Sequence, residues 1–528
     1  MDFANQLESF VWNFNKKLTR AQVSAFVAAI IAGFLAHGYV FFNRLSYHDN
    51  SASLFSLGAT YESGRWFLGI IYKLMLLTTK TYSVPVFNGV LSLLFIAISA
   101  IFVVEIFDVK SKAGGIYIGA MMAVYPVVTS IFSFMFTSWP YFLALLLAVL
   151  SARAIIVHGG VRGVIEGIIL LALSLGIYQA FFAVTITILL FRMLLNVLNG
   201  TTTTVADYGK GGILALISLG VGLGLWGILR KVFQTVKHIE AVDYKGMDEA
   251  FSVAKLPDRF AVLLKSFFGF RYEGINSLRY LRLATMVIFA VALIQLVVLL
   301  IKRVDGMALR LSALVGVILL PVGMGVVYLL STSSEYQVDS LMLYGDIFVL
   351  IIPVLFIEFM DTTEFMEGLL TSGLKAVTWL QIACMLVMAI GYIYLDNAAY
   401  MKADLIQEEA AAYFTELAAN IKACPGFDDD MEIVLVGWDD LEDGTMVNIS
   451  PLEQLDGIQL EKYPNLEELV TYSGSIHFMR EHVGFGNDNV IIDEGELADD
   501  ATVKAMPCYP DDGSIAVVDG RVVVKLGQ

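Results

Sequence analysis

Apolar residues in this chain gather in runs of roughly 18–24 residues that contain few or no charges. A helix rising about 1.5 Å per residue crosses about 30 Å of hydrocarbon over such a run. Because lipid offers the backbone no hydrogen-bond partners, a run that crosses it must be helical. The pattern predicts about eleven membrane-spanning helices, at residues 21–42, 84–107, 114–135, 138–157, 163–180, 181–198, 211–230, 281–301, 309–330, 343–360 and 376–395. The fifth and sixth are separated by a fold at 178–180.

Basic residues in the short loops predict the orientation, since cytoplasmic loops carry an excess of Lys and Arg. They precede the first predicted span, follow the second and the eighth, and bracket the turn between the fourth and the fifth. The loops 136–138 and 331–342 contain neither Lys nor Arg. This places the N-terminus in the cytoplasm, and eleven spans place the C-terminal part outside. The first apolar run is too long for a cleavable signal peptide, so we expect it to stay as an anchor.

Two segments on the predicted outer side are not spans. Residues 43–83 mix apolar, aromatic and charged positions, and the long loop 231–280 contains an amphipathic stretch at 247–270, in which Pro257 opens a second helix. We expect both to form helices that lie on the membrane surface. A further amphipathic piece, 361–374, is expected on the cytoplasmic face.

Charge separates the chain into two parts. The whole chain is 57% hydrophobic with a net charge of −16, but residues 396–528 contain 28 acidic and 7 basic residues, a net charge of −21. The first 395 residues contain 22 acidic and 27 basic residues, a net charge of +5. We therefore predict a transmembrane domain at 1–395 and an acidic extracytoplasmic domain at 396–528. The acidity argues against a nucleic-acid partner.

The acidic domain has mixed α and β signals. A helix is predicted at 397–422, strands at 431–437 and 489–493, and a hairpin at 515–526 around Asp519-Gly520. The fold class is thus a polytopic all-α membrane protein with a C-terminal soluble α+β domain. Cys424 and Cys508 form one disulfide if this domain lies outside the cytoplasm, and two free thiols are the other interpretation.

No phosphate loop, dinucleotide fingerprint, nucleophile elbow or metal-binding His pair is present. Ionisable and aromatic residues instead gather in five loops on the predicted outer face, which suggests a cavity near the outer leaflet. Each group also has a plain structural interpretation, as a helix cap, an interfacial anchor or a helix–helix contact. The candidates are His48 and Asp49; Arg65 and Trp66; Tyr178 and Gln179; Arg271 and Arg279; and Glu335, Tyr336, Tyr344 and Asp346.

Four short motifs, in this order along the chain, resemble a known family. They are His48-Asp49-Asn50, Ser63-Gly64-Arg65-Trp66, Thr137-Ser138-Trp139-Pro140 and Leu175-Gly176-Ile177-Tyr178-Gln179-Ala180. Together with the predicted topology they resemble the bacterial membrane glucosyltransferases that modify O-antigen, relatives of the GT-C superfamily of polyprenyl-phosphate-sugar-dependent enzymes. The resemblance covers residues 20–395, and the segment 506–514 is similar to tails of some members.

The resemblance implies a reaction and roles. Asp49 would be the general base on the acceptor hydroxyl, and the donor would be a sugar, glucose by resemblance, on undecaprenyl phosphate in the outer leaflet of the bacterial inner membrane. Arg65 is the first candidate to stabilise the leaving phosphate, followed by Arg271 and Arg279. Many members have two adjacent acidic residues at the loop position; here Asn50 follows Asp49, so no obligatory metal or other cofactor is expected.

Three other functions stay open at this stage. A transporter or flippase for a lipid-linked sugar would show inverted repeats and mid-membrane charges, which the sequence does not clearly have. A glycan polymerase or ligase of the same envelope pathway would share the helix count. A scaffold that displays the acidic domain would need no site at all.

Overall fold

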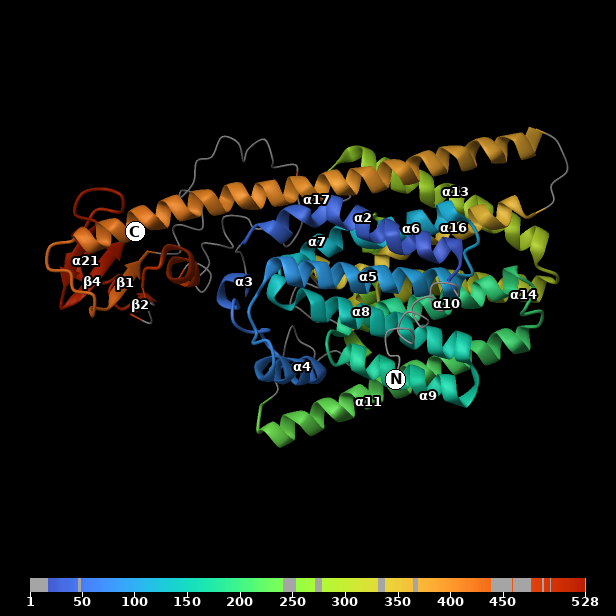
Figure 1. The fold of residues 1–528 in the computed structure, drawn as a ribbon, viewed down its shortest axis with the longest axis horizontal. Coiled ribbons are helices and arrows are strands. Elements are labelled where there is room, and N and C mark those ends of the chain that lie inside the picture. Colours follow the sequence, from blue (N-terminus) through green and yellow to red (C-terminus); the bar gives the residue numbers. More distant parts are fainter. Residues whose placement is uncertain are drawn as a thin grey trace, which may run out of the picture. The chain divides into compact units, whose positions relative to one another are not determined.

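The computed structural model describes residues 18–45, 49–240, 253–270, 278–330, 338–363, 369–437, 458, 476–486, 489–493 and 495–527 (Figure 1). Most of these residues are helical. The N-terminal half contains α2 (Arg20–Phe42), α3 (Asp49–Ala52), α4 (Trp66–Leu77), α5 (Pro85–Phe107), α6 (Lys112–Val124), α7 (Pro126–Phe132), η1 (Met135–Thr137), α8 (Ser138–Arg153), η2 (Ala154–His158), α9 (Gly160–Leu175), η3 (Gln179–Phe181), α10 (Phe182–Leu198) and α11 (Val205–Lys237). There follow η5 (Val253–Lys255), α12 (Leu256–Phe268), α13 (Arg279–Arg303), α14 (Met307–Met324), α15 (Val327–Leu330), η6 (Ser340–Met342), η7 (Tyr344–Ile347), α16 (Phe348–Asp361), α17 (Leu369–Ala423), β1 (Ile433–Val436), η9 (Met479–Val483), β2 (Val490–Ile492), α21 (Ala501–Ala505), β3 (Ile515–Val518) and β4 (Arg521–Lys525).

The predicted fold class is confirmed. Within the described ranges, nine helices are long and apolar enough to cross a membrane, and each coincides with a predicted span. The two other predicted spans correspond to shorter helices, α9 with 16 residues and α16 with 14. The chain is therefore a polytopic helical membrane protein. The predicted fold at 178–180 is also confirmed, because α9 ends at Leu175 and α10 begins at Phe182.

Glycine permits a close helix pairing in the membrane part. Helix α2 packs against α5 and α6, and α5 packs in turn against α8 (Figure 1). A Cβ atom on Gly115 or Gly119 of α6 would overlap the backbone of α2 at Ala21 or Ala25. Small residues of this kind let two helix backbones approach in lipid, where packing drives association. Tyr125 separates α6 from α7 because Pro126 has no N–H to continue the helix.

Helix α17 combines two elements that were predicted from the sequence as separate helices. The predicted last span, 376–395, and the predicted tail helix, 397–422, form one continuous helix of 55 residues. No Gly or Pro interrupts residues 392–423, and alanine is frequent there, so nothing local stops the helix. Within the membrane part, Gln381 of α17 pairs with Gln295 of α13 (2.9 Å).

The C-terminal strands form one sheet in the order β2-β1-β4-β3. Strand β1 is parallel to β2 and β4, and β3 is antiparallel to β4. The predicted hairpin is confirmed, with positive φ at both Asp519 (48°) and Gly520 (79°), as a two-residue turn requires. The core beneath the sheet consists of Val434, Val436, Val503 and Val523.

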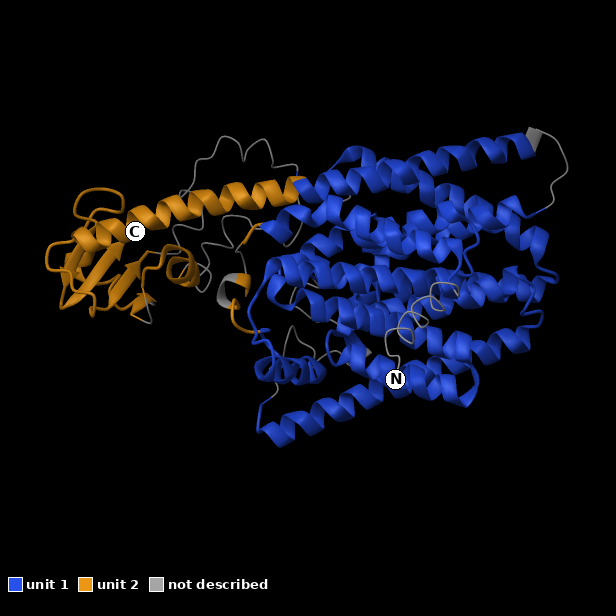
Figure 2. Ribbon diagram, in the orientation of Figure 1, with its two compact units in different colours: residues 1–42, 57–397, 458–462 blue, residues 43–56, 398–457, 463–528 orange. Residues whose placement is uncertain are grey.

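The chain divides into two compact units (Figure 2). The membrane unit comprises residues 1–42, 57–397 and 458–462, and the tail unit comprises residues 43–56, 398–457 and 463–528. The division along α17 thus follows Asn397. The loop that carries Asp49 groups with the C-terminal domain rather than with the helices that flank it in the sequence.

Candidate functional site

A tight turn before α4 presents Arg65 in the membrane unit. The Arg65 N–H donates to the carbonyl of Thr60 (2.8 Å), and the Gly64 N–H donates to that of Tyr61 (3.1 Å). Gly64 has φ of +75°, and a Cβ there would lie 3.3 Å from the Trp226 ring. The turn therefore depends on glycine at this position.

Neighbouring helices hold this turn by its carbonyl groups. Trp226 Nε1 of α11 donates to the Gly64 carbonyl (3.2 Å), and Gln234 Nε2 of the same helix donates to that of Tyr61 (2.9 Å). Gln179 Nε2, from the turn between α9 and α10, donates to the Ser63 carbonyl (3.2 Å). Donors from separate segments thus fix the backbone on the N-terminal side of Arg65.

The first turn of α4 is fixed from the same side. The N–H groups of Phe67 and Leu68 both donate to the Gly176 carbonyl, at 2.8 and 3.1 Å. These are two of the donors that a helix start leaves without an intrahelical acceptor. The Trp66 ring stacks on Phe233 of α11, with centroids 5.5 Å apart and planes 4° from parallel.

Arg65 is buried, with 9% of its surface exposed, and its guanidinium faces two tyrosines. Its central carbon lies 5.7 Å from the Tyr141 ring centroid and 5.5 Å from that of Tyr178. Such a cation–aromatic arrangement favours the charged side chain in a site with little water. The structure therefore brings Arg65, Trp66, Tyr178 and Gln179, all predicted from the sequence, into one cluster.

Aromatic contacts continue from this cluster to a further predicted residue. Tyr178 contacts Phe181 edge to face (5.7 Å), and Phe181 contacts Tyr344 in the same way (5.8 Å). The Tyr344 hydroxyl donates to the Met122 carbonyl (2.6 Å). Asp346 follows in η7 and is buried, with 6% exposed. A third of the five predicted loops, the one with Tyr344, is thus connected to the Arg65 cluster through aromatic side chains.

Asp49 belongs to the tail unit and begins the short helix α3. Its side chain is exposed. Next to it, Asn50 is 3% exposed and donates from Nδ2 to the Leu45 carbonyl (2.9 Å), which closes the loop.

The remaining predicted residues are distributed as follows. Arg279 is the exposed first residue of α13. His48, Arg271, Glu335 and Tyr336 lie outside the described residues.

The cysteines are free thiols, so the disulfide interpretation is not realised in this structure. Cys424 Sγ lies 3.7 Å from the carbonyl oxygen of Ile515 in strand β3 and 3.8 Å from that of Pro425.

One buried carboxyl group was not selected from the sequence. Asp396 of α17 is fully buried, and Thr129 Oγ1 of α7 donates to its Oδ1 (2.7 Å). Oδ2 has no hydrogen-bond partner among the described residues. A buried carboxyl group without full pairing is costly and calls for a physical reason. The sequence does mark this residue, as an acidic residue directly after an apolar run. The predicted span ended at 395, so Asp396 was assigned to the acidic domain and not to the membrane part.

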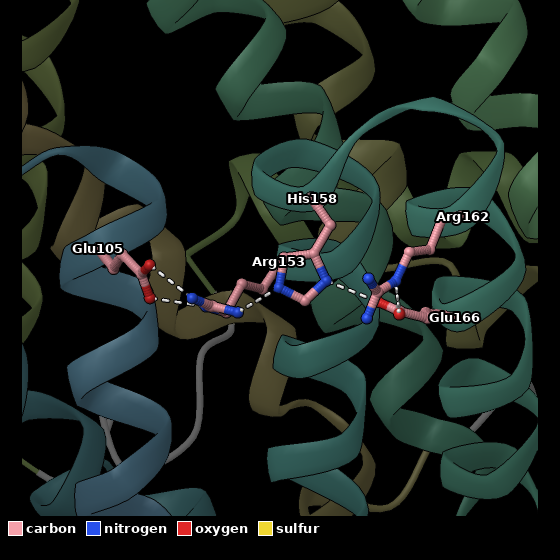
Figure 3. Close-up of polar contacts among 5 residues, drawn as sticks. All are labelled: Glu105, Arg153, His158, Arg162 and Glu166. Carbon is pink, nitrogen blue, oxygen red and sulfur yellow. Dashed lines mark hydrogen bonds and ion pairs between the residues drawn. The ribbon is translucent and has the colours of Figure 1, made fainter. Parts of the chain in front are cut away.

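A second polar network joins α5, α8 and α9 (Figure 3). Arg153 donates to both carboxylate oxygens of Glu105, each at 2.7 Å, and from Nη1 to His158 Nε2 (2.9 Å). Since Arg can only donate, His158 carries its proton on Nδ1 and donates it to Glu166 (2.6 Å). Arg162 also pairs with Glu166 (2.7 Å). These contacts connect the C-terminal ends of α5 and α8 with the first turns of α9.

Among the residues that the structure describes, no three His, Cys, Asp or Glu side chains lie close enough together to hold a metal ion. A family model described as "Glucosyl transferase GtrII" matches residues 38–350. No curated protein matches significantly, and neither does any solved structure. The matched range includes the Asp49 loop, the Arg65 cluster and Asp346.

Proposed function

Because this chain belongs to the GtrII glucosyl transferase family, we propose that it moves glucose from undecaprenyl phosphate to a cell-surface glycan. The proposed place is the outer face of the bacterial cytoplasmic membrane, with the N-terminus in the cytoplasm and the C-terminal domain outside. Family membership makes the protein a membrane glycosyltransferase. The lipid-linked donor, the glycan acceptor and the membrane face are the proposed refinements, and a donor confined to the bilayer suits a chain built of membrane helices.

The proposed reaction is a single displacement with inversion. Asp49 accepts the proton of the acceptor hydroxyl while that oxygen attacks the anomeric carbon of the donor sugar. The bond from this carbon to the phosphate oxygen breaks, and undecaprenyl phosphate leaves with the electron pair. Its leaving oxygen is part of a phosphate, so it needs positive charge more than a proton.

Arg65 is the proposed cation, and its setting is the observation that carries the proposal. The guanidinium lies over two tyrosine rings, and its backbone belongs to a turn that hydrogen bonds from other segments hold in place. Such a group is preorganised for a phosphate, because Arg offers paired donors and stays charged. Arg279 and Arg271 are the next candidates. The proposed contacts to sugar and acceptor come from His48, Trp66, Tyr178, Gln179, Glu335, Tyr336, Tyr344 and Asp346.

The test is transfer of labelled glucose by purified protein from undecaprenyl phosphate to the surface glycan. We expect Asp49→Asn to lower kcat by about 100-fold or more, since general-base catalysis typically contributes that much. Asp512→Asn, which neutralises an exposed carboxylate in the C-terminal domain, is the matched control and should leave the rate unchanged. Full activity of Asp49→Asn at normal protein level would overturn the base assignment.

The same assay separates the rival functions. Movement of the lipid-linked sugar across proteoliposomes without a new glycosidic bond would identify a flippase. Joining of whole repeat units would identify a polymerase or ligase. Activity should persist in EDTA, because no metal is needed in the proposed step. Loss of activity that Mg²⁺ or Mn²⁺ restores would overturn this part.

A further inference from the structure

The C-terminal domain holds the loop that carries the proposed base. Arg44, five residues before Asp49, belongs with this loop to the tail unit. Its guanidinium Nη2 donates to His482 Nδ1 (3.2 Å), and its carbonyl accepts from Gln407 Nε2 of α17 (3.0 Å). Two side chains from separate parts of the C-terminal domain therefore hold one residue of the loop, one at the side chain and one at the backbone.

His482 is itself held firmly. Its ring stacks on Phe478, with centroids 4.4 Å apart and planes 9° from parallel. Phe478 is fully buried and contacts Phe414 of α17, which is also fully buried (5.8 Å). The acceptor for Arg44 thus sits on a packed aromatic core, so little rotamer freedom remains to be lost when Arg44 binds.

The protonation state of His482 fits this role. Burial, and then the nearby Arg44, lower the pKa of His482 to about 4. The imidazole is therefore neutral near pH 7 and leaves Nδ1 free to accept, with its proton on Nε2. Burial raises the pKa of the neighbouring Glu481 carboxyl, and the charges of Arg480 and Arg44 act against this shift.

A hydrogen bond between their sequence neighbours connects the position of Arg44 to that of Asp49. Asn50 Nδ2 donates to the Leu45 carbonyl (2.9 Å), so the residue after Asp49 is tied to the residue after Arg44. Leu45 is buried, with 4% exposed. Asp49 therefore lies in the sequence between Leu45 and Asn50, the two residues that this hydrogen bond joins.

We propose that the C-terminal domain is a positioning element for the catalytic loop, in which Gln407 and His482 hold Arg44 and thereby set where the Asp49 carboxylate stands. The proposal rests on the proposed function, because it assumes that Asp49 is the base. In this proposal the acidic domain takes part in the transfer reaction by positioning Asp49, a role that the composition of the domain does not suggest. His482 and Gln407 act through the loop and are positioning residues.

Two variants of His482 separate the hydrogen bond from the packing. His482→Phe keeps the stacked ring and removes the acceptor, whereas His482→Asn gives up the ring and offers Oδ1 near the place of Nδ1. We expect His482→Phe to lower kcat about 10- to 100-fold with little change in the donor KM, the size of effect that a small misplacement of a reacting group produces. His482→Asn should recover much of that loss. His477→Phe, in the same segment but bonded to Arg480 instead, is the matched control and should leave kcat unchanged.

Gln407→Glu tests the backbone contact separately. It keeps the length of the side chain and replaces the donor to the Arg44 carbonyl by an acceptor. We expect a similar fall in kcat. Combination with Asp49→Asn then shows whether these residues act through Asp49. Added to Asp49→Asn, His482→Phe should lower the residual rate less than twofold, whereas a merely structural role would lower it by the full factor again.

Limited trypsin digestion tests whether the loop is held in place, through the rate of cleavage after Arg44 and without any assay of glucose transfer. His482→Phe and Gln407→Glu should speed cleavage after Arg44, while cleavage after Arg521, within β4, should stay slow and report an intact domain. Faster cleavage at Arg44 with an unchanged kcat would overturn the proposal while leaving the proposed function standing. Full activity of Asp49→Asn would instead overturn the proposed function, and the trypsin result would then describe a structural contact only.

Discussion

The rings of Tyr141 and Tyr178 are stacked, with centroids 4.1 Å apart and planes 7° from parallel, although one lies on α8 and the other in the turn before α10. Arg65 faces both rings from a third segment. This contact joins two of the four motifs of the family resemblance with the residue that directly follows a third, and it sets the orientation of the proposed phosphate-binding cation.

Replacement of Tyr141 tests this contact. Tyr141→Leu removes the stacked ring and the cation–aromatic contact, which are typically worth about 0.5–1.5 and 0.5–2 kcal/mol. We expect the free energy of unfolding in detergent to fall by about 1–3 kcal/mol, and the donor KM to rise because Arg65 loses its orientation. Tyr141→Phe keeps the ring and is the control. Equal stability and KM in the two variants would show that the ring does not hold Arg65.

The turn before Arg65 should be sensitive to a single methyl group. Gly64→Ala places a side chain at φ of +75° and against Trp226, and the left-handed conformation alone costs about 1–2 kcal/mol. We expect a lower melting temperature and slower transfer. Gly224→Ala in α11 is the control, because nothing lies within 4 Å of its Cβ and alanine favours a helix. A Gly64→Ala variant as stable as Gly224→Ala would contradict this account of the turn.

The network of Figure 3 should stabilise the packing of α5 against α8. Glu105→Gln leaves Arg153, whose side chain is 22% exposed, without its carboxylate partner. We expect unfolding to become easier by about 1–3 kcal/mol, the usual cost of leaving such a group underpaired. Thermal unfolding measures this. Lys210→Gln removes an exposed pair with Asp207 and should change nothing measurable, so equal effects of the two variants would refute the role of the network.

Acid should weaken the C-terminal domain through His482. Burial, and then Arg44, lower its pKa in the folded chain from the ordinary 6.5 to about 4. The unfolded chain therefore takes up the proton first, and the stability that His482 contributes is complete above pH 6.5 and lost as the pH falls to about 4. Hydrogen exchange of β4 in the full chain between pH 7 and 4 measures it.

His482→Phe is the control for this pH dependence. Glu481 acts in the opposite sense, because burial raises the pKa of its carboxyl, so the difference between wild type and His482→Phe isolates the histidine. Identical pH dependence in both proteins would show that His482 makes no such contribution.

Much of the fold followed from local patterns. Nine predicted spans are helices of sufficient length, and the hairpin turn is at the Asp519-Gly520 pair that predicted it. Asp396 was overlooked because its partner, Thr129, lies on another helix, and no window of sequence contains both. The predicted break near 396 is absent because hydropathy marks where a span ends and not where a helix ends.

The sequence by itself determined that this is a membrane protein with an acidic C-terminal domain, because hydropathy and charge are sums over neighbouring residues. It also supplied the motifs of the family and the candidates Asp49, Arg65 and Tyr178. Only the tertiary structure decided that Arg65 meets Tyr141 and Tyr178, and that Arg44 is held by Gln407 and His482. Such contacts join segments far apart in the chain, and they form only when the packing of whole helices and of the sheet brings those side chains within reach.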